Sequence, residues 1–249
     1  MAAVPAIARK TGENEHAGKS RSSAGTNMIS RGRYRAGRSA ALGMACVFAA
    51  VFVFLLAEVV YFGQLVRLDT SVDEMLSRPA AWIILLSKGL HYLFSAISMI
   101  VITTALACIF WRKIGSRKAI LMTGLIVIGA GLNQLIKLAV ARPRPADAMI
   151  ALPDTAFPSG HTSATTIFVG LLCTMVLPRL SPGLQRSVMI SVSVFVAALV
   201  GFSRLALHVH WLTDVLAGLA LGGVVVSAGV LARDFLPPAG PTRGQAGRS

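Results

Sequence analysis

The sequence predicts an all-α membrane protein, built as a bundle of about six transmembrane helices. Two observations predict this fold class. The chain has 249 residues, of which 55% are hydrophobic and only 14% charged, and the apolar residues form long runs separated by short basic loops. Charged and polar residues interrupt this apolar pattern in three clusters between positions 137 and 214. The clusters are therefore the candidate functional part of the chain.

The predicted elements follow one another with short connections. Residues 1–38 carry eight basic residues and predict a disordered basic cytoplasmic tail. The run from 40 to 62 begins too late for a cleaved signal peptide and predicts a signal anchor. Residues 64–88 mix charged and apolar positions, which is typical of an amphipathic interfacial helix. The remaining expected spans are 89–111, 119–140, 163–177, 187–207 and 212–236. The membrane domain is thus expected at 39–236, followed by a short polar tail at 237–249.

The basic residues predict the orientation of the chain. A net charge of +14 would suggest nucleic acid for a soluble protein, but here the cations concentrate in the tails and in the loops at 112–118 and 179–186. Such loops mark the cytoplasmic side of a membrane protein. With six spans, both termini are cytoplasmic and the three polar clusters meet on the extracytoplasmic side.

The first and third clusters supply fixed positive charge. Lys137, Arg144 and Arg204 lie at predicted helix ends, where an uncompensated charge is costly. The carboxylates in this stretch are too few to neutralise the cations: Asp147, Asp154 and Asp214. We therefore expect an anionic ligand.

The second and third clusters supply the chemistry. Pro158-Ser159-Gly160-His161 leads into an apolar run, so its backbone N–H groups would form the anion cradle of a helix N-terminus, which suits phosphate. His210 and Asp214 are four residues apart, so the carboxylate can hold one ring nitrogen and leave the other free to attack. His161 lies beside the cradle and can protonate a leaving oxygen.

These clusters resemble the three signature motifs of the type 2 phosphatidic acid phosphatase (PAP2) superfamily. The pattern is Lys-x6-Arg-Pro, then Pro-Ser-Gly-His, then Ser-Arg-x5-His-x3-Asp, and every fixed position is filled. The resemblance implies that His210 is the phosphorylated nucleophile, that Asp214 orients it, and that His161 is the general acid and then the base. The implied phosphate-binding residues are Lys137, Arg144, Ser159, Gly160 and Arg204. The implied supporting residues are Ser203, Pro158 and Pro145. No metal or other cofactor is implied.

Two residues beside the motifs need their own interpretation. Arg142 is expected to contact the interface or a lipid headgroup, because the motif spacing selects Arg144. His208 stands where the superfamily frequently has a small residue. Both a contact with substrate and a place lining the interface are open for it.

The resemblance implies a bacterial inner-membrane enzyme that hydrolyses a lipid phosphate monoester or diphosphate at the outer leaflet. Its substrate and the bilayer are its expected partners, and nucleic acid is not. The resemblance most often implies undecaprenyl diphosphate phosphatase. Phosphatidylglycerophosphate, phosphatidic acid and lipid A 1-phosphate are the alternative substrates. Transfer of the phosphoryl group to another lipid, and ion transport, are the alternative functions, although a transporter predicts polar residues along the spans rather than at one end.

Overall fold

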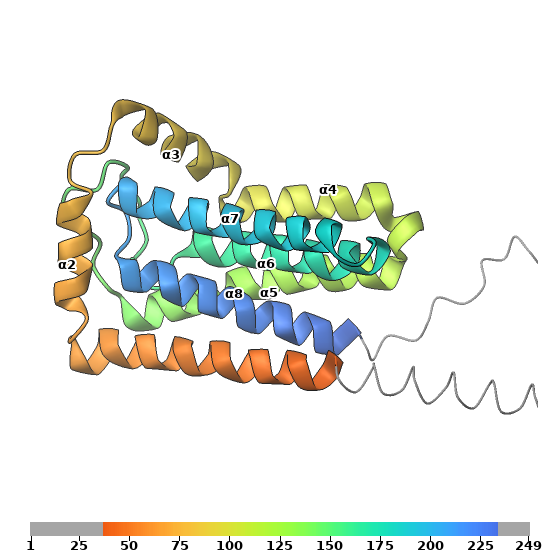
Figure 1. Cartoon of the computed structure of the whole chain (residues 1–249). Helices are drawn as coiled ribbons and strands as arrows, with labels where there is room; N and C mark the ends of the chain where they lie inside the picture. Colours follow the sequence, from red (N-terminus) through yellow and green to blue (C-terminus); the bar gives the residue numbers. More distant parts are fainter. Residues whose placement is uncertain (1–36, 234–249) are drawn as a thin grey trace, which may run out of the picture. The chain divides into compact units, whose positions relative to one another are not determined.

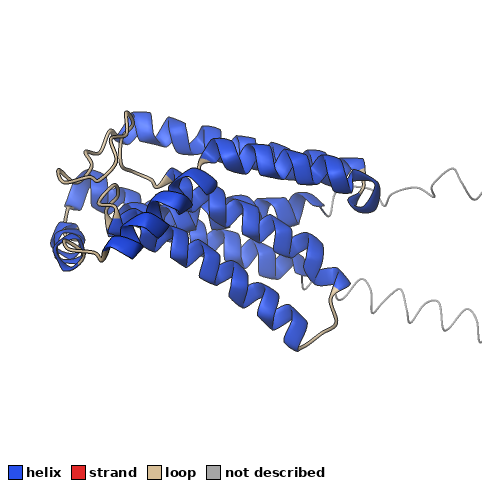
Figure 2. Ribbon diagram, turned by 90° about the horizontal axis from the view of Figure 1, so that it is seen from above, coloured by secondary structure: helices blue, strands red, loops and turns tan. Residues whose placement is uncertain are grey.

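The structure, a computed structural model, describes residues 37–233, and every element in that range is a helix, as predicted (Figures 1 and 2). The first helix, Gly37–Phe62, ends in a π-helical turn, η1 (Glu58–Phe62). The later elements are α2 (Val66–Met75), α3 (Ala81–Leu93), α4 (Ala96–Ile114), α5 (Ser116–Val140), α6 (Gly160–Val176), η2 (Leu177–Arg179), α7 (Leu184–Ala206) and α8 (Leu212–Arg233). The predicted tails at 1–38 and 237–249 lie almost wholly outside the described residues.

Five helices are long and apolar enough to cross a membrane, and a sixth span results if α3 and α4 count as one bent pair. The two helices of this pair meet at 56°. One predicted boundary was wrong: residues 64–88 do not form a single amphipathic helix. Pro79 lacks an amide hydrogen and restricts the residue before it, so the chain breaks after α2 and Ala80 is extended. The apolar stretch from Ala81 onward therefore belongs to the bent span.

The centre of the bundle is the contact between α6 and α8, which small residues make possible. A Cβ on Gly218 would lie 2.7 Å from the carbonyl oxygen of Ser159, and one on Gly222 would lie 2.5 Å from Cβ of Thr166. Side chains from α5, α6 and α8 form the adjoining apolar core: Met122, Leu125, Ile126, Ile167, Leu171, Met175 and Val225. The two helices thus bring the second and third clusters to one end of the bundle.

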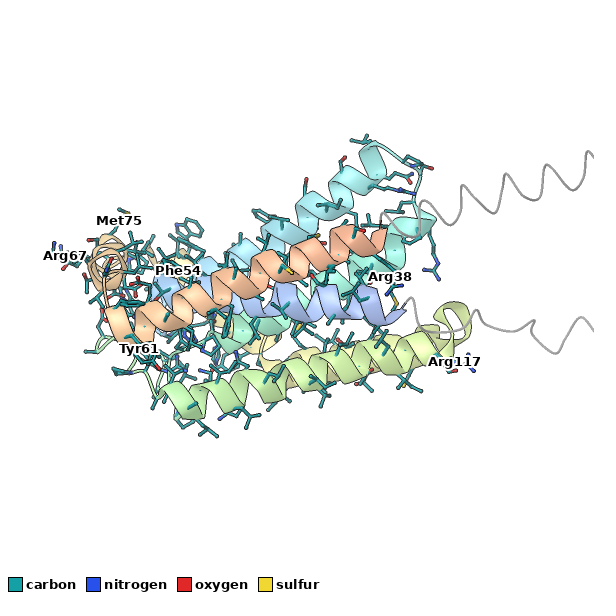
Figure 3. The ribbon with its side chains drawn as sticks, turned by 90° about the horizontal axis from the view of Figure 1, so that it is seen from below. Arg38, Phe54, Tyr61, Arg67, Met75 and Arg117 are labelled. Carbon is teal, nitrogen blue, oxygen red and sulfur yellow. The ribbon has the colours of Figure 1, made fainter. Side chains whose placement is uncertain are left out.

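Helix α2 lies across that end, roughly at right angles to the long helices (Figure 1). Arg67 and Met75 mark this end in Figure 3, whereas Arg117 lies at the opposite end. The loops at 141–159 and 207–211 connect helices on the α2 side and carry several of the motif residues, namely Arg144, Pro145, Pro158, Ser159 and His210. An amphipathic helix is therefore packed directly over the candidate site.

Candidate active site

The first cluster lies where α5 ends and the following loop folds back. Lys137 is 3% exposed, and its Nζ lies 3.1 Å from Oδ2 of Asp154 and also donates to the carbonyl of Thr155. Arg144 donates from Nη2 to Oδ1 of Asp154 at 2.6 Å and from Nε to the Asp154 carbonyl at 2.9 Å. Thr155 Oγ1 completes the link by donating to the Lys137 carbonyl at 2.9 Å. One carboxylate thus aligns two cations.

Asp154 pairs with both Lys137 and Arg144, and since one carboxylate cannot neutralise two cations, the expected shortage of counter-charges remains. Burial raises the pKa of Asp154, but the opposing effects of Lys137 and Arg144 are larger in sum and hold it below its ordinary value. The carboxylate is consequently ionised at neutral pH. Sequence spacing did not reveal the pairing, because it depends on how the 141–159 loop folds.

The second cluster begins α6 as predicted. Ser159 is the N-cap residue, and its side chain accepts a hydrogen bond from the amide of Thr162. The Ser159 amide donates to the carbonyl of Asp214 at 3.0 Å, so the second and third motifs are joined directly. A Cβ on Gly160 would lie 3.3 Å from Oδ1 of Asn133, so a larger residue at position 160 would crowd the Asn133 side chain. Asn133 itself donates to Ser163 Oγ on α6 at 3.2 Å and so links α5 to α6.

His161 and Arg204 are linked through His91 on α3. Arg204 is fully buried, and its Nη1 lies 2.8 Å from Nδ1 of His91. The His91 carbonyl lies 2.9 Å from Nε2 of His161, and the two imidazole rings stack at 4.7 Å. Ser203 accepts from Nη2 of Arg204 at 3.0 Å and so helps to fix the guanidinium. His91 has no place in the three motifs.

His210 has the arrangement of a nucleophile. Its Nε2 lies 3.3 Å from Nη1 of Arg144, and since a guanidinium can only donate, Nε2 must be the unprotonated nitrogen. Its Nδ1 then carries the hydrogen and faces Asp214 Oδ2 at 3.5 Å. This separation is too long for a normal hydrogen bond, and no other described residue provides one to Nδ1. Such contacts are often long before substrate binds.

Burial lowers the pKa of His210 to about 4, with Asp214 opposing the shift and Arg144 and Lys137 adding to it. The imidazole is therefore neutral at physiological pH. A neutral ring with an unprotonated Nε2 is the form that can attack phosphorus.

Arg142 corrects another expectation, because it is part of the site rather than an interfacial contact. Its Nη1 donates to Oδ1 of Asp214 at 2.6 Å, and its Nη2 donates to Oδ2 of Asp69 at 2.7 Å. The backbone amide of Trp211 donates to the second oxygen of Asp214 at 2.8 Å. Asp214 is therefore held on both oxygens.

His208 contacts α2, a packing role that neither of the two alternatives stated for it had included. Its Nε2 lies 3.0 Å from the carbonyl of Leu76, and its Nδ1 lies 2.7 Å from Oδ1 of Asp73. The residue is fully buried and has a left-handed φ of 53°. That backbone conformation favours glycine.

One group of described side chains has the spacing of metal ligands: Asp73, Asp147 and His208, whose ligand atoms lie within 4.8 Å of one another. The 2.7 Å contact between His208 and Asp73 is a direct hydrogen-bond distance. The geometry is that of an imidazole held by carboxylates, outside the motif residues.

Taken together, the structure joins Lys137, Arg144, His210 and Asp214 in one network, and His161 with Arg204 in a second network bridged by His91. The buried prolines Pro145 and Pro158 shape the loops that carry them. Sequence reasoning gave no role in the site to His91, Asp69 or Asp154, although it counted Asp154 among the nearby carboxylates. Their only sequence signal was an ionisable side chain within or next to an apolar stretch.

A helical membrane bundle that gathers a neutral histidine, an orienting carboxylate and several cations at one end defines an integral membrane phosphatase. The PAP2 superfamily pattern matches residues 117–236, and the chain is 32% identical over 166 residues to phosphatidylglycerophosphatase B of Bacillus subtilis, covering 61% of this chain and 78% of that protein. The chain therefore belongs to the PAP2 superfamily.

Two further comparisons are consistent with this assignment. A crystal structure of a transmembrane PAP2 type phosphatidylglycerolphosphate phosphatase from Bacillus subtilis superposes with a TM-score of 0.63 at 24% identity, covering 75% of this chain and 95% of that one. An uncharacterised 22.5 kDa protein in the cps region of Klebsiella pneumoniae is 39% identical over 64 residues, which are 26% of this chain and 30% of that protein. The first comparison supports the bundle architecture.

Proposed function

We propose that this membrane phosphatase hydrolyses a lipid phosphate monoester or diphosphate through a phosphohistidine at His210. The observation that carries the proposal is the orientation of His210, whose unprotonated Nε2 faces Arg144 while Nδ1 faces Asp214. A nucleophile oriented by a carboxylate and placed among cations suits phosphoryl transfer, which depends mainly on positioning and charge stabilisation.

In the first step, Nε2 of His210 attacks phosphorus and the bond to the leaving oxygen breaks. His161 gives a proton to that oxygen. For this transfer His161 must enter the step with protons on both ring nitrogens, since a neutral imidazole is not an acid near neutral pH. Its Nε2 then donates to the carbonyl of His91 at 2.9 Å, and the proton on the other nitrogen passes to the leaving oxygen, which leaves a neutral ring that can act as the base in the second step. In the second step, water attacks phosphorus, His161 takes the proton of the water, and the P–N bond breaks.

The phosphoryl oxygens would lie among Lys137, Arg144 and Arg204, with the backbone at Ser159 and Gly160 completing the cradle at the start of α6. A bound phosphate would compete with Asp154 for Lys137 and Arg144. Ser203 fixes Arg204, and Pro145 and Pro158 hold the loops. No step in this scheme calls for a metal or another cofactor.

The proposed location is the bacterial inner membrane, with both termini in the cytoplasm and the site on the extracytoplasmic side. The separation of Arg117 from the α2 end supports this orientation (Figure 3), because basic loops favour the cytoplasmic side. The substrate's tail would stay in the bilayer while its phosphate enters the cation cluster.

Two lipids are the leading substrates. Undecaprenyl diphosphate is the substrate that the resemblance to the superfamily motifs most often implies. Phosphatidylglycerophosphate is favoured by a separate observation, the name of the 32% identical Bacillus subtilis relative. Phosphatidic acid and lipid A 1-phosphate complete the set to be compared.

The proposal is tested by phosphate release from these four lipids, using purified protein in detergent with EDTA. We expect one lipid to be hydrolysed fastest and the His210→Ala variant to be inactive on all of them. Phosphohistidine should be detectable in the wild-type protein after rapid quenching. Full turnover by His210→Ala would refute the covalent mechanism.

Adding a second lipid or a sugar as acceptor distinguishes a hydrolase from a phosphotransferase. A hydrolase releases inorganic phosphate at an unchanged rate, whereas a transferase shifts the product to the phosphorylated acceptor. Failure to release phosphate from any lipid, together with acceptor-dependent turnover, would replace hydrolysis by transfer.

A further inference from the structure

Asp69 on α2 is a buried carboxylate far from the motifs in sequence. It is 2% exposed, although the sequence places it on an amphipathic helix. A buried charge is costly unless it is paired and hydrogen-bonded. Asp69 meets this condition with three donors: Nη2 of Arg142 at 2.7 Å, the amide of Thr213 at 2.9 Å and the hydroxyl of Thr213 at 2.7 Å.

One partner of Asp69, Arg142, is also a partner of Asp214, and the other, Thr213, is the neighbour of Asp214 in the chain. Arg142 uses its other terminal nitrogen, Nη1, for Oδ1 of Asp214 at 2.6 Å and for the Thr213 hydroxyl at 2.7 Å. Thr213 is the residue immediately before Asp214, in the first turn of α8. One guanidinium therefore bridges two carboxylates, and Asp69 also fixes the backbone beside the second one.

We propose that Asp69 is a positioning residue of the phosphatase reaction, acting through Arg142 and Thr213 to hold Asp214 against His210. The inference rests on the proposed role of His210. Without the Asp69 charge, Asp214 would be the one carboxylate left to Arg142 among the described residues, and Arg142 could bind it through both nitrogens. Asp214 Oδ2 would then be drawn from the Trp211 amide and from Nδ1 of His210, and the nucleophile would lose its orientation.

Helix α2 contributes to the site because it carries Asp69. The helix covers the end of the bundle (Figure 1), and Asp69 is the point at which it contacts both the first and the third motif. In the described residues, the side-chain contacts of Asp69 are with Arg142 and Thr213, and neither is one of the proposed phosphate-binding residues. Asp69 therefore affects the rate of the chemical step more than the binding of substrate.

The test compares Asp69→Asn with Glu74→Gln, a matched change at an exposed position of the same helix. Turnover of phosphatidylglycerophosphate in mixed detergent micelles gives kcat and KM. We expect kcat of Asp69→Asn to fall on the order of 10- to 100-fold with KM within about twofold, since small displacements of reacting groups have effects of this size. Asp69→Glu should recover part of the loss, and Glu74→Gln should match the wild type.

A second readout works whatever the natural lipid is. Orthovanadate can bond to the nucleophile as a phosphoryl-transfer mimic, so its affinity, measured by thermal shift in EDTA, should weaken at least tenfold in Asp69→Asn and not in Glu74→Gln. If the residues form one unit, Asp69→Asn combined with Arg142→Gln should weaken vanadate binding no more than Arg142→Gln alone.

Wild-type vanadate affinity and kcat in folded Asp69→Asn would overturn the positioning role, as would fully additive losses in the double variant. Loss of folding in Asp69→Asn alone shifts the test to Asp69→Glu and Arg142→Lys, which keep the charges but alter the geometry. Unchanged vanadate affinity in both of these variants also overturns the role. Unimpaired turnover by His210→Ala is a different result, because it refutes the proposed function itself.

Discussion

At the scale of single residues, the charge state of His210 determines how the enzyme responds to acid. Burial lowers its pKa to about 4 from an ordinary value of 6.5, so the ring stays neutral between these values, where an ordinary histidine would be protonated. Since kcat/KM reports the free enzyme, the loss of activity due to His210 should occur near pH 4 rather than near 6.5.

This pH dependence is measured as kcat/KM with two substrates whose phosphates ionise differently, phosphatidic acid and an aryl phosphate. A loss of activity caused by titration of an enzyme group appears at the same pH with both substrates. A shared loss centred near 6.5 would show that His210 is not the group with the lowered pKa.

The motif residues could be predicted from sequence because they match the PAP2 superfamily motifs in residue type, order and spacing. Lys137, Ser159 and His210 are examples, and the structure places each of them at the same end of the bundle. Asp69, His91 and Asp154 could not be predicted, because their contacts with the motif residues form only when distant helices and the 141–159 loop pack together. Arg142 was assigned wrongly for the same reason: its two carboxylate partners lie 72 and 73 positions away.

At the scale of elements, the close approach of α6 and α8 makes Gly218 sensitive to substitution. A Cβ there would lie 2.7 Å from a backbone oxygen of Ser159, and backbone cannot rotate aside as a side chain can. Gly218→Ala should lower stability by about 1–3 kcal/mol, the usual effect of overpacking, and should reduce activity by shifting Ser159.

Gly124→Ala is the matched control for Gly218→Ala. Gly124 is also helical, but a Cβ at that position meets nothing within 4 Å. Thermal unfolding in detergent and phosphate release should both match the wild type. Equal losses in the two variants would contradict the role of close packing at Gly218.

Hydropathy predicted the helices closely. A long apolar segment in a bilayer must satisfy its backbone hydrogen bonds internally, and a helix does so. The exception was the region from 64 to 93. The first part of this region is rich in charged residues and the second part in apolar residues. The two were predicted as one amphipathic helix, although Pro79 separates them. Composition alone also did not predict that α2 packs on the site, or that its Asp69 carboxylate is buried there.

At the scale of the whole molecule, the two ends of the bundle should face different compartments. Single cysteines at Met75 and Arg117, in a variant lacking Cys46, Cys108 and Cys173, test this orientation (Figure 3). A membrane-impermeant maleimide should label the cysteine at Met75, which is 81% exposed, in intact cells, and the one at Arg117 only after lysis. The reverse pattern would place the active site in the cytoplasm.

The left-handed backbone at His208 sets a limit on redesign of this enzyme. A non-glycine residue in that conformation is strained by roughly 1–2 kcal/mol, and here the imidazole offsets the strain with bonds to Asp73 and Leu76. Glycine would relieve the strain and remove the bonds together, so the two effects oppose each other. An engineer who wants a more heat-resistant enzyme should therefore strengthen the partners on α2 and leave His208 in place.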